Sequence, residues 1–324
     1  QFIQFANNRE TFCLNPFSLL DVPRQGRTDS EIKDEIQERV KMVKDLIGQM
    51  ASPSKVLSDL QSSWVEQAIM TVLEKVGADG TPTDVAKILL EMKDQHGRTK
   101  DLSDMLLPYC KGGNYGPMFN GRNNIDFDNS FIVLELDGLD SMLDLRSVIL
   151  LQLIMNIQSS MYMGDRGQRK VCGIDEAWDL LAQRGDTVSN VSAFFNKAVR
   201  RVRKYNGSAL TITQGINDYY DVMGSTGQAL LENSDFVFLL MQKPESLMSL
   251  RKHERLVLSP HEYDLLRSVH RGEGYSELML LAPTGRGIGR LVVPRETQLH
   301  YTTNADELAK IEKLKKEGMS TEEA

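Results

Sequence analysis

Two acidic residues, Asp175 and Glu176, directly follow the apolar run KVCGI at residues 170–174. Such a run predicts a strand, and the residues after it lie where function sits in a parallel sheet. A carboxylate there can hold the Mg²⁺ of a bound nucleotide, and a second one can orient and polarise the attacking water. We therefore expect Asp175 to hold a metal and Glu176 to act on water. The alternative is a strand that ends in a solvated acidic loop.

Gln214 follows the next apolar run, ALTIT at residues 209–213. If the two strands are neighbours, this amide lies beside the acidic pair. It could then hydrogen-bond a γ-phosphate or the attacking water, as polar residues do in nucleotide hydrolases. Taken alone, Gln214 could equally be a helix-capping or loop residue, so the two strand ends together carry the prediction.

A basic segment, Arg200-Arg201-Val202-Arg203-Lys204, ends the helix predicted at residues 191–204. Arg200 and Arg203 are three residues apart and share one helix face, so both could reach a phosphate. An arginine that stabilises the transition-state charge, in its own subunit or from a neighbour, accelerates phosphoryl transfer. Cations at a helix C-terminus also offset the helix dipole, which is the simpler interpretation.

Four apolar runs separated by helices predict an α/β fold with a parallel sheet that is covered on both faces. A hairpin is predicted later, with Arg286 between two glycines at its turn. Arg286 is a second candidate for a contact to a neighbouring subunit, although a hairpin arginine is more often solvated. The runs lie at residues 131–136, 170–174, 209–213 and 236–241, and the hairpin strands at 275–282 and 288–293.

A block without any strand pattern precedes the sheet. Thr28-x-x-Glu31 and Ser63-x-x-Glu66 have the spacing of capping boxes and are predicted to open two of its helices. We predict an all-helical insertion at residues 26–124 within a core formed by residues 1–25 and 125–300, followed by a charged helical tail at residues 301–324. This arrangement would give the core a helical subdomain of ordinary size.

The composition is that of an ordinary globular protein, with 324 residues, 41% hydrophobic and 26% charged. A net charge of −7 argues against non-specific coating of DNA. Three scattered cysteines without a CxxC pair argue against a zinc site or a disulfide framework. The most apolar stretch, residues 148–157, is too short to span a membrane and predicts a buried helix.

Four motifs together resemble one family. LNPF at residues 14–17, IDEAWDLL at 174–181, R-x-x-RK followed by YNGSALTITQ at 200–214, and GRG at 285–287 are similar to the motor domain of the cytoplasmic assembly ATPases of type IV secretion systems, nearest to the F-type conjugation variant. The resemblance implies a RecA-like P-loop NTPase core with a mostly parallel sheet and an inserted all-α subdomain.

The family implies hexamers that use ATP and Mg²⁺ to power pilus assembly and transfer of DNA or protein. It implies a cytoplasmic location, peripheral to the inner membrane, with other type IV secretion subunits as partners and no sequence-specific nucleic-acid binding. By resemblance, Glu176 is the catalytic base and Gln214 the sensor. Arg200, Arg203 and Lys204 form the R-x-x-RK motif, in which Lys204, together with Arg286, is expected to bind the nucleotide.

The phosphate-binding motif G-x-x-x-x-G-K-[ST] does not occur in the 324 residues. We expect this loop to precede the residues present here, so that the chain alone is inactive. Two alternatives stay open. One is a ring ATPase that couples conjugation by translocating DNA, and the other is a non-catalytic docking module that retains the fold.

Overall fold

The computed structural model describes residues 2–5, 12–24, 26–53, 55–125, 127, 129–163, 167–181 and 190–319. The chain forms two compact units. The first comprises Gln1–Ile174 and Gln183–Leu210, and the second comprises Asp175–Ala182 and Thr211–Ala324.

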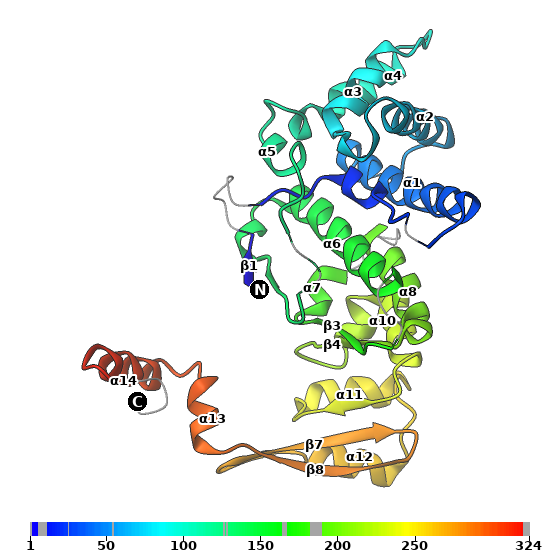
Figure 1. Cartoon of the computed structure of the whole chain (residues 1–324). Coiled ribbons are helices and arrows are strands. Elements are labelled where there is room, and N and C mark those ends of the chain that lie inside the picture. Colours follow the sequence, from blue (N-terminus) through cyan, green and yellow to red (C-terminus); the bar gives the residue numbers. More distant parts are fainter. Residues whose placement is uncertain are drawn as a thin grey trace. The chain divides into compact units, whose positions relative to one another are not determined.

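The first unit contains the helical block, in which α1 packs against α2 and α3 packs against α4. In Figure 1 these helices run from blue to cyan. Amphipathic helices of this kind are stable because one face of each is buried against its neighbours. The elements are η1 (Pro16–Leu20), α1 (Asp29–Ala51), α2 (Asp59–Val76), η2 (Gly77–Asp79), α3 (Pro82–Glu91), α4 (Arg98–Leu106), η3 (Leu107–Tyr109) and α5 (Gly116–Phe119).

The capping box predicted at Thr28 is confirmed. The Thr28 hydroxyl accepts from the N–H of Glu31, and the Glu31 carboxylate accepts from the N–H of Thr28 at 2.8 Å. The box predicted at Ser63 is wrong. The helix α2 already begins at Asp59, where Ser58 and Gln61 form the capping box. Both serines have a suitable partner three residues on, so spacing alone could not choose between them.

The LNPF segment is a structural anchor of the first unit. Asn15 is only 4% exposed, and its side-chain amide donates to the carbonyls of Gly80 (2.9 Å) and Gly121 (3.1 Å). Its side-chain oxygen accepts from Phe17 N–H at 3.0 Å and caps η1. Asn15 therefore ties η1 to two separate loops of the helical block.

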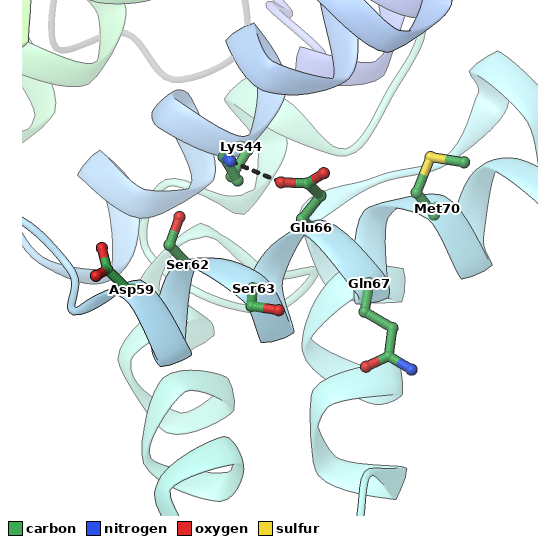
Figure 2. A pocket seen from close by; sticks show the side chains of 7 residues that line it. All are labelled: Lys44, Asp59, Ser62, Ser63, Glu66, Gln67 and Met70. Carbon is green, nitrogen blue, oxygen red and sulfur yellow. Dashed lines mark hydrogen bonds and ion pairs between the residues drawn. The ribbon is translucent and has the colours of Figure 1, made fainter.

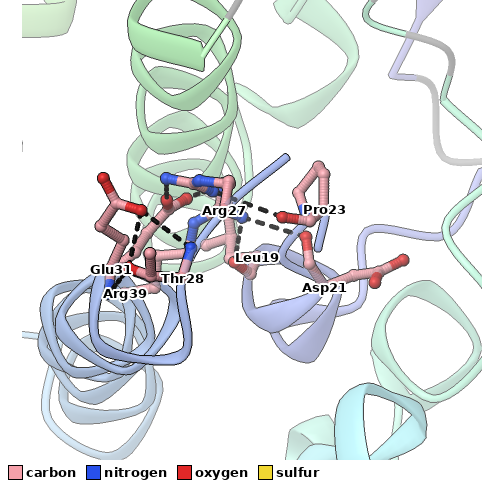
Figure 3. A network of polar contacts seen from close by, with 8 residues as sticks. Leu19, Asp21, Pro23, Arg27, Thr28, Glu31 and Arg39 are labelled. Carbon is pink, nitrogen blue, oxygen red and sulfur yellow. Dashed lines mark hydrogen bonds and ion pairs between the residues drawn. The ribbon is translucent and has the colours of Figure 1, made fainter. Parts of the chain in front are cut away.

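Arg39 fastens the same segment to α1 (Figure 3). Its guanidinium donates to Leu19 O at 2.6 Å and to Asp21 O at 3.3 Å, and it pairs with Glu35 at 2.7 Å. Glu35 also pairs with Arg27. A buried guanidinium with several acceptors keeps its hydrogen bonds satisfied, so this network fixes where the chain enters α1.

The first unit also holds two short pairs of strands. β1 (Phe2–Gln4) pairs in parallel with β2 (Val133–Glu135), in the register Phe2↔Val133. β3 (Lys170–Ile174) pairs with β4 (Gly207–Thr211). Around them lie η4 (Asp137–Leu139), α6 (Leu143–Met163), α8 (Asn190–Val202) and η5 (Arg203–Tyr205).

The prediction that β3 and β4 are buried on both faces is wrong for this chain. Residues alternate between half-buried and exposed along both strands, with Val171 71% and Leu210 48% exposed. Successive side chains in a strand point to opposite faces, and only one face of this pair is covered here. β4 also ends at Thr211, earlier than predicted, so that Gln214 lies in the loop beyond it.

The most apolar stretch of the sequence lies inside α6, as predicted for a buried helix. Val148, Ile149 and Met155 are fully buried, and α6 packs against α1 and α8. Among the described residues, no helix combines the length and the apolar character that crossing a bilayer requires.

The second unit is built around an antiparallel sheet, in which β7 pairs with β5, β6 and β8. The predicted hairpin is confirmed as β7 and β8, but its turn is shorter than predicted: β8 begins at Gly285, so Arg286 lies in the strand rather than in the turn. The run at residues 236–241, predicted as a parallel strand, instead forms β5, which is antiparallel to β7 because it pairs with the hairpin. The elements are α7 (Ala177–Leu181), α9 (Asp218–Asp221), α10 (Gly224–Glu232), β5 (Val237–Leu239), α11 (Pro244–Lys252), α12 (Pro260–Ser268), β6 (Arg271–Gly272), β7 (Tyr275–Ala282), β8 (Gly285–Val292), α13 (Arg295–His300) and α14 (Ala305–Lys316).

We predict that Asn15→Ala lowers the free energy of unfolding by about 2–4 kcal/mol, because it leaves two carbonyls without their donor inside the first unit. Urea denaturation followed by circular dichroism measures the change. Asn233→Ala is the matched control, since exposed Asn233 makes one local bond, to Ala229 O, and should change stability by less than about 0.5 kcal/mol. An unchanged midpoint for Asn15→Ala would contradict the anchoring role.

Candidate functional site

The turn after β3 places the predicted acidic pair. Asp175 directly follows Ile174, and the turn leads at once into α7. Ala177 N–H donates to Ile212 O at 2.9 Å, and Asp179 N–H donates to Glu176 O at 2.9 Å. The first of these bonds ties the turn to the segment that follows β4. The residues beyond both strands are therefore held at one place.

Glu176 has a positive φ of 49°. This left-handed conformation costs a residue with a Cβ atom about 1–2 kcal/mol, so it persists only where its surroundings impose it. Here main-chain bonds at the Glu176 carbonyl and at the Ala177 N–H hold this conformation. Such outliers cluster at functional sites, which supports a functional role for this turn.

The Glu176 carboxylate is held at both oxygens. Gln214 Nε2 donates to Oε1 at 3.2 Å, and Trp178 Nε1 donates to Oε2. The predicted proximity of Glu176 and Gln214 is therefore confirmed, since β3 and β4 are neighbours. The catalytic role of each side chain stays a prediction.

Asp175 keeps most of its carboxylate available. Its Oδ1 accepts from Glu176 N–H at 2.9 Å, and the side chain is exposed. No group of three or more His, Cys, Asp or Glu side chains that could hold a metal ion occurs in the described part of the chain. Mg²⁺ is commonly bound by one or two carboxylates together with substrate phosphates and water. A lone accessible carboxylate fits that requirement.

The loop that carries Gln214 is fastened on its far side. Gly215 N–H donates to Asp218 Oδ2 at 2.9 Å, and Ile216 N–H donates to Gln242 Oε1 at 3.4 Å. Asn217 Nδ2 donates to Ser246 O at 3.2 Å. These contacts anchor the loop to the segment that begins α11. Gln214 therefore extends from a loop of restricted conformation.

The predicted basic residues at the end of α8 belong to the first unit. Arg200 and Lys204 are exposed. Arg201 lies 3.9 Å from Glu38, in a pair exposed on both sides and therefore of little value for stability. The side chain of Arg203 lies outside the described residues. The roles of Arg200, Arg203 and Lys204 stay predictions.

Arg286 lies on β8 opposite Leu281 and has partners within its own chain. Its guanidinium donates to Val257 O at 2.9 Å and to the Glu262 carboxylate at 3.3 Å. Glu262 is also part of the capping box of α12, where it accepts from the N–H of the N-cap residue Ser259 at 2.6 Å. Arg286 thus joins the hairpin to the start of α12.

A surface groove of about 590 Å³ lies on α1 and α2 (Figure 2). Lys44 and Glu66 pair at 2.6 Å along it, and the remaining lining is mostly neutral and polar. The groove belongs wholly to the first unit and includes none of the predicted site residues. Its lining residues are Lys44, Asp59, Ser62, Ser63, Glu66, Gln67 and Met70.

The fold is similar to solved P-loop NTPases. The structure of VirB4 of Thermoanaerobacter pseudethanolicus matches with a TM-score of 0.68 at 21% identity, over 91% of this chain and 77% of that one. The plasmid coupling protein TrwB, in complex with a non-hydrolysable GTP analogue, matches with a TM-score of 0.50 at 13% identity, over 90% of this chain and 74% of that one. The fold, together with the P-loop domain family that matches the chain, is thus that of a RecA-like α/β P-loop NTPase, as predicted.

The family follows from the sequence comparison. The TraG P-loop domain matches residues 85–324, and the chain belongs to that family. Protein TraC of Escherichia coli (strain K12) is 25% identical over 328 residues, which cover 97% of this chain and 36% of TraC. The chain therefore spans about a third of the length of this curated relative. The predicted resemblance to the type IV secretion ATPases of the TraC type is confirmed.

Trp178 is a site residue that the sequence prediction missed. The motif IDEAWDLL at residues 174–181 includes Trp178, but the sequence prediction assigns it no role. Its position two residues after Glu176 was the available signal, because the first turn of a helix can bring a side chain back toward the residue before it. The direction of the indole depends on the turn, which the sequence did not reveal.

The contact between Arg286 and Glu262 leads to a prediction about how the stability of the fold depends on pH. The pKa of Glu262 is held below its usual range by the N–H and then the hydroxyl of Ser259, and after these by Arg286. Because the pKa of Glu262 is lower in the folded than in the unfolded state, the ionised carboxylate stabilises the fold at pH values above the pKa that Glu262 has in the unfolded chain. The contribution is lost as pH falls through the folded pKa. Arg286→Ala should raise the Glu262 pKa part of the way and reduce this loss of stability in acid.

An NMR titration of the Glu262 carboxyl carbon measures the effect of Arg286→Ala. Arg290→Ala is the control on the same strand, because Arg290 pairs with Glu277 and should leave Glu262 unchanged. If Glu262 titrated identically in the Arg286→Ala variant, the contact within the chain would not be populated. Arg286 would then be available to a neighbouring subunit.

Proposed function

We propose that this chain is the motor portion of a type IV secretion or conjugation ATPase, which hydrolyses ATP to power pilus assembly and transfer of DNA or protein. The observation that carries the proposal is the hydrogen bond between Gln214 and Glu176, formed beyond two neighbouring strands. A carboxylate and an amide at such a place are the parts that orient a water molecule for attack on a phosphate. Membership of a P-loop family supports a nucleotide as the substrate.

Each residue has a distinct part in this proposal. Mg-ATP, when bound, supplies the phosphoryl group together with a cation that offsets its charge. Asp175 holds that cation through its exposed carboxylate. Glu176 accepts the proton of the attacking water, and Gln214 orients that water or the phosphate by hydrogen bonding. The fixed turn matters because a small misplacement of a reacting group costs much of the rate.

The basic residues complete the charge balance. Arg200 and Arg203 offset the charge that develops on the γ-phosphate, and Lys204 binds the nucleotide. Arg286 is the candidate for a contact supplied by a neighbouring subunit. That role requires Arg286 to leave Glu262 for the nucleotide, and the Glu262 titration tests whether the contact that must be broken is populated.

The phosphate-binding loop is the missing part of this site. We propose that polypeptide outside these 324 residues supplies it, since the relative TraC is much longer than this chain. The chain by itself would then be inactive. We further propose that the complete protein forms a homo-hexamer on the cytoplasmic side of the inner membrane and works there with other type IV secretion subunits.

The first test is Glu176→Gln in a polypeptide long enough to include the phosphate-binding loop. ATP turnover should fall at least about 100-fold, because the amide cannot accept the proton, whereas the affinity for a fluorescent ATP analogue should be kept. Phosphate release and fluorescence titration measure the two quantities. Glu245→Gln, at an exposed carboxylate in the first turn of α11, should change neither. Normal turnover in Glu176→Gln would refute the assignment of the base.

The second test concerns the metal. Asp175→Asn removes the negative charge that would hold Mg²⁺, so the affinity for Mg-ATP should fall about 10-fold or more. The affinity for ATP in the presence of EDTA should change little. Titration of the same fluorescent analogue with and without Mg²⁺ measures this difference. Equal losses under both conditions would contradict a metal role and indicate a general defect of the turn.

A DNA-translocating coupling ATPase is the other function in this class. The likeness to TrwB concerns the fold alone at 13% identity and does not favour it. Strong stimulation of ATP turnover by DNA, lost as salt rises, would support this alternative over the assembly role. A complete protein that binds no nucleotide would instead indicate a docking module.

A further inference from the structure

We propose that Trp178 is a positioning residue that fixes the Glu176 carboxylate through Oε2 and leaves Oε1 as the oxygen that accepts the proton of the attacking water. The inference rests on the proposed function, because it assigns the two oxygens of the proposed base to different tasks. It is carried by the different partners of these oxygens, the Trp178 indole on one and the Gln214 amide on the other.

The indole is held by the same turn as the carboxylate. Trp178 lies in the first turn of α7, a helix anchored by the fully buried side chains of Ala177 and Leu181. Ala177 N–H is bonded to Ile212 O, so the start of α7 is fixed to the segment after β4. The donor and the acceptor therefore belong to the same turn, which this main-chain bond holds in place.

The two donors differ in chemistry. An indole N–H can only donate and cannot titrate, so Trp178 offers the carboxylate the same hydrogen at every physiological pH. The Gln214 amide has a donor and an acceptor, and it lies at 3.2 Å on a loop rather than on the turn itself. A water molecule can replace the amide at Oε1 and then be bonded by the amide oxygen. Oε1 is thus the oxygen at which the partner can be exchanged.

The strained backbone of Glu176 accompanies this arrangement of the carboxylate. If Glu176 needed only to be exposed, an ordinary conformation would serve at lower cost. The positive φ at Glu176 accompanies a carboxylate that is bonded to the side chain two residues later and to the loop beyond β4. The strain is therefore associated with a specific orientation of the carboxylate.

A purely packing role for Trp178 is the competing explanation, and two substitutions separate the alternatives. Trp178→Phe keeps an aromatic ring but has no donor. Trp178→His restores an N–H, since imidazole Nε2 lies as many bonds from the main chain as indole Nε1. Trp64→Phe is the matched control, because Trp64 lies in α2 and the chain has two tryptophans.

The variants are compared in the longer, ATP-hydrolysing polypeptide. Trp178→Phe should lower kcat about 10- to 100-fold with KM for ATP changed less than about two-fold, because only the orientation of the base is lost. Trp178→His should restore part of kcat, so that the fall in log kcat is smaller than in Trp178→Phe by at least about a third. Trp64→Phe should leave both constants unchanged. The proposal would be overturned by an unchanged kcat in Trp178→Phe, or by a kcat in Trp178→His as low as that in Trp178→Phe.

Fluorescence provides a test that does not depend on turnover. In the 324-residue chain carrying Trp64→Phe, Trp178 is the single tryptophan, and Glu176→Leu should shift its emission maximum because the indole loses its charged acceptor. An identical spectrum would overturn the contact, even if Trp178→Phe failed to fold. The proposed function has its own test, because normal ATP turnover in Glu176→Gln would contradict it whatever the Trp178 variants show. Loss of turnover in Glu176→Gln combined with normal turnover in Trp178→Phe would refute only the positioning role.

Discussion

The hydrogen bond from Ala177 N–H to Ile212 O is the contact on which the candidate site depends. It joins the turn after β3 to the segment after β4, so that residues 38 positions apart meet as Glu176 and Gln214. It also fixes the start of α7 and thereby the indole of Trp178. Without this bond, the positive φ of Glu176 would have little to sustain it.

The motifs that carry the family resemblance fall into two kinds, one buried and structural and the other exposed and suited to chemistry. The segment around Asn15 is buried and ties η1 to the loops at Gly80 and Gly121, so it organises the first unit and contributes no exposed reactive group. The segment at Asp175 and Glu176 is exposed and held by a few directed bonds. A conspicuous motif can therefore specify packing as readily as chemistry.

The second unit shows how one side chain can serve structure while retaining a possible function. Arg286 reaches from β8 to Val257 and Glu262, which secures the hairpin against the start of α12. Arg286 and Val257 are exposed and Glu262 is half-buried, and ion pairs at the surface contribute little to stability. Arg286 can therefore leave Glu262 for a stronger anion at modest cost to the fold.

The helical block, the α/β class and the proximity of Glu176 to Gln214 could be predicted from the residues alone, because they follow from periodicity and from polar residues placed beyond apolar runs. The residues alone did not predict which faces of β3 and β4 are covered, or that β5 joins an antiparallel sheet. An apolar run indicates a strand but does not indicate which strands pair with it. Only the tertiary structure decided the left-handed turn at Glu176 and the bond from Trp178. The physical reason is that both depend on main-chain contacts between residues distant in the chain.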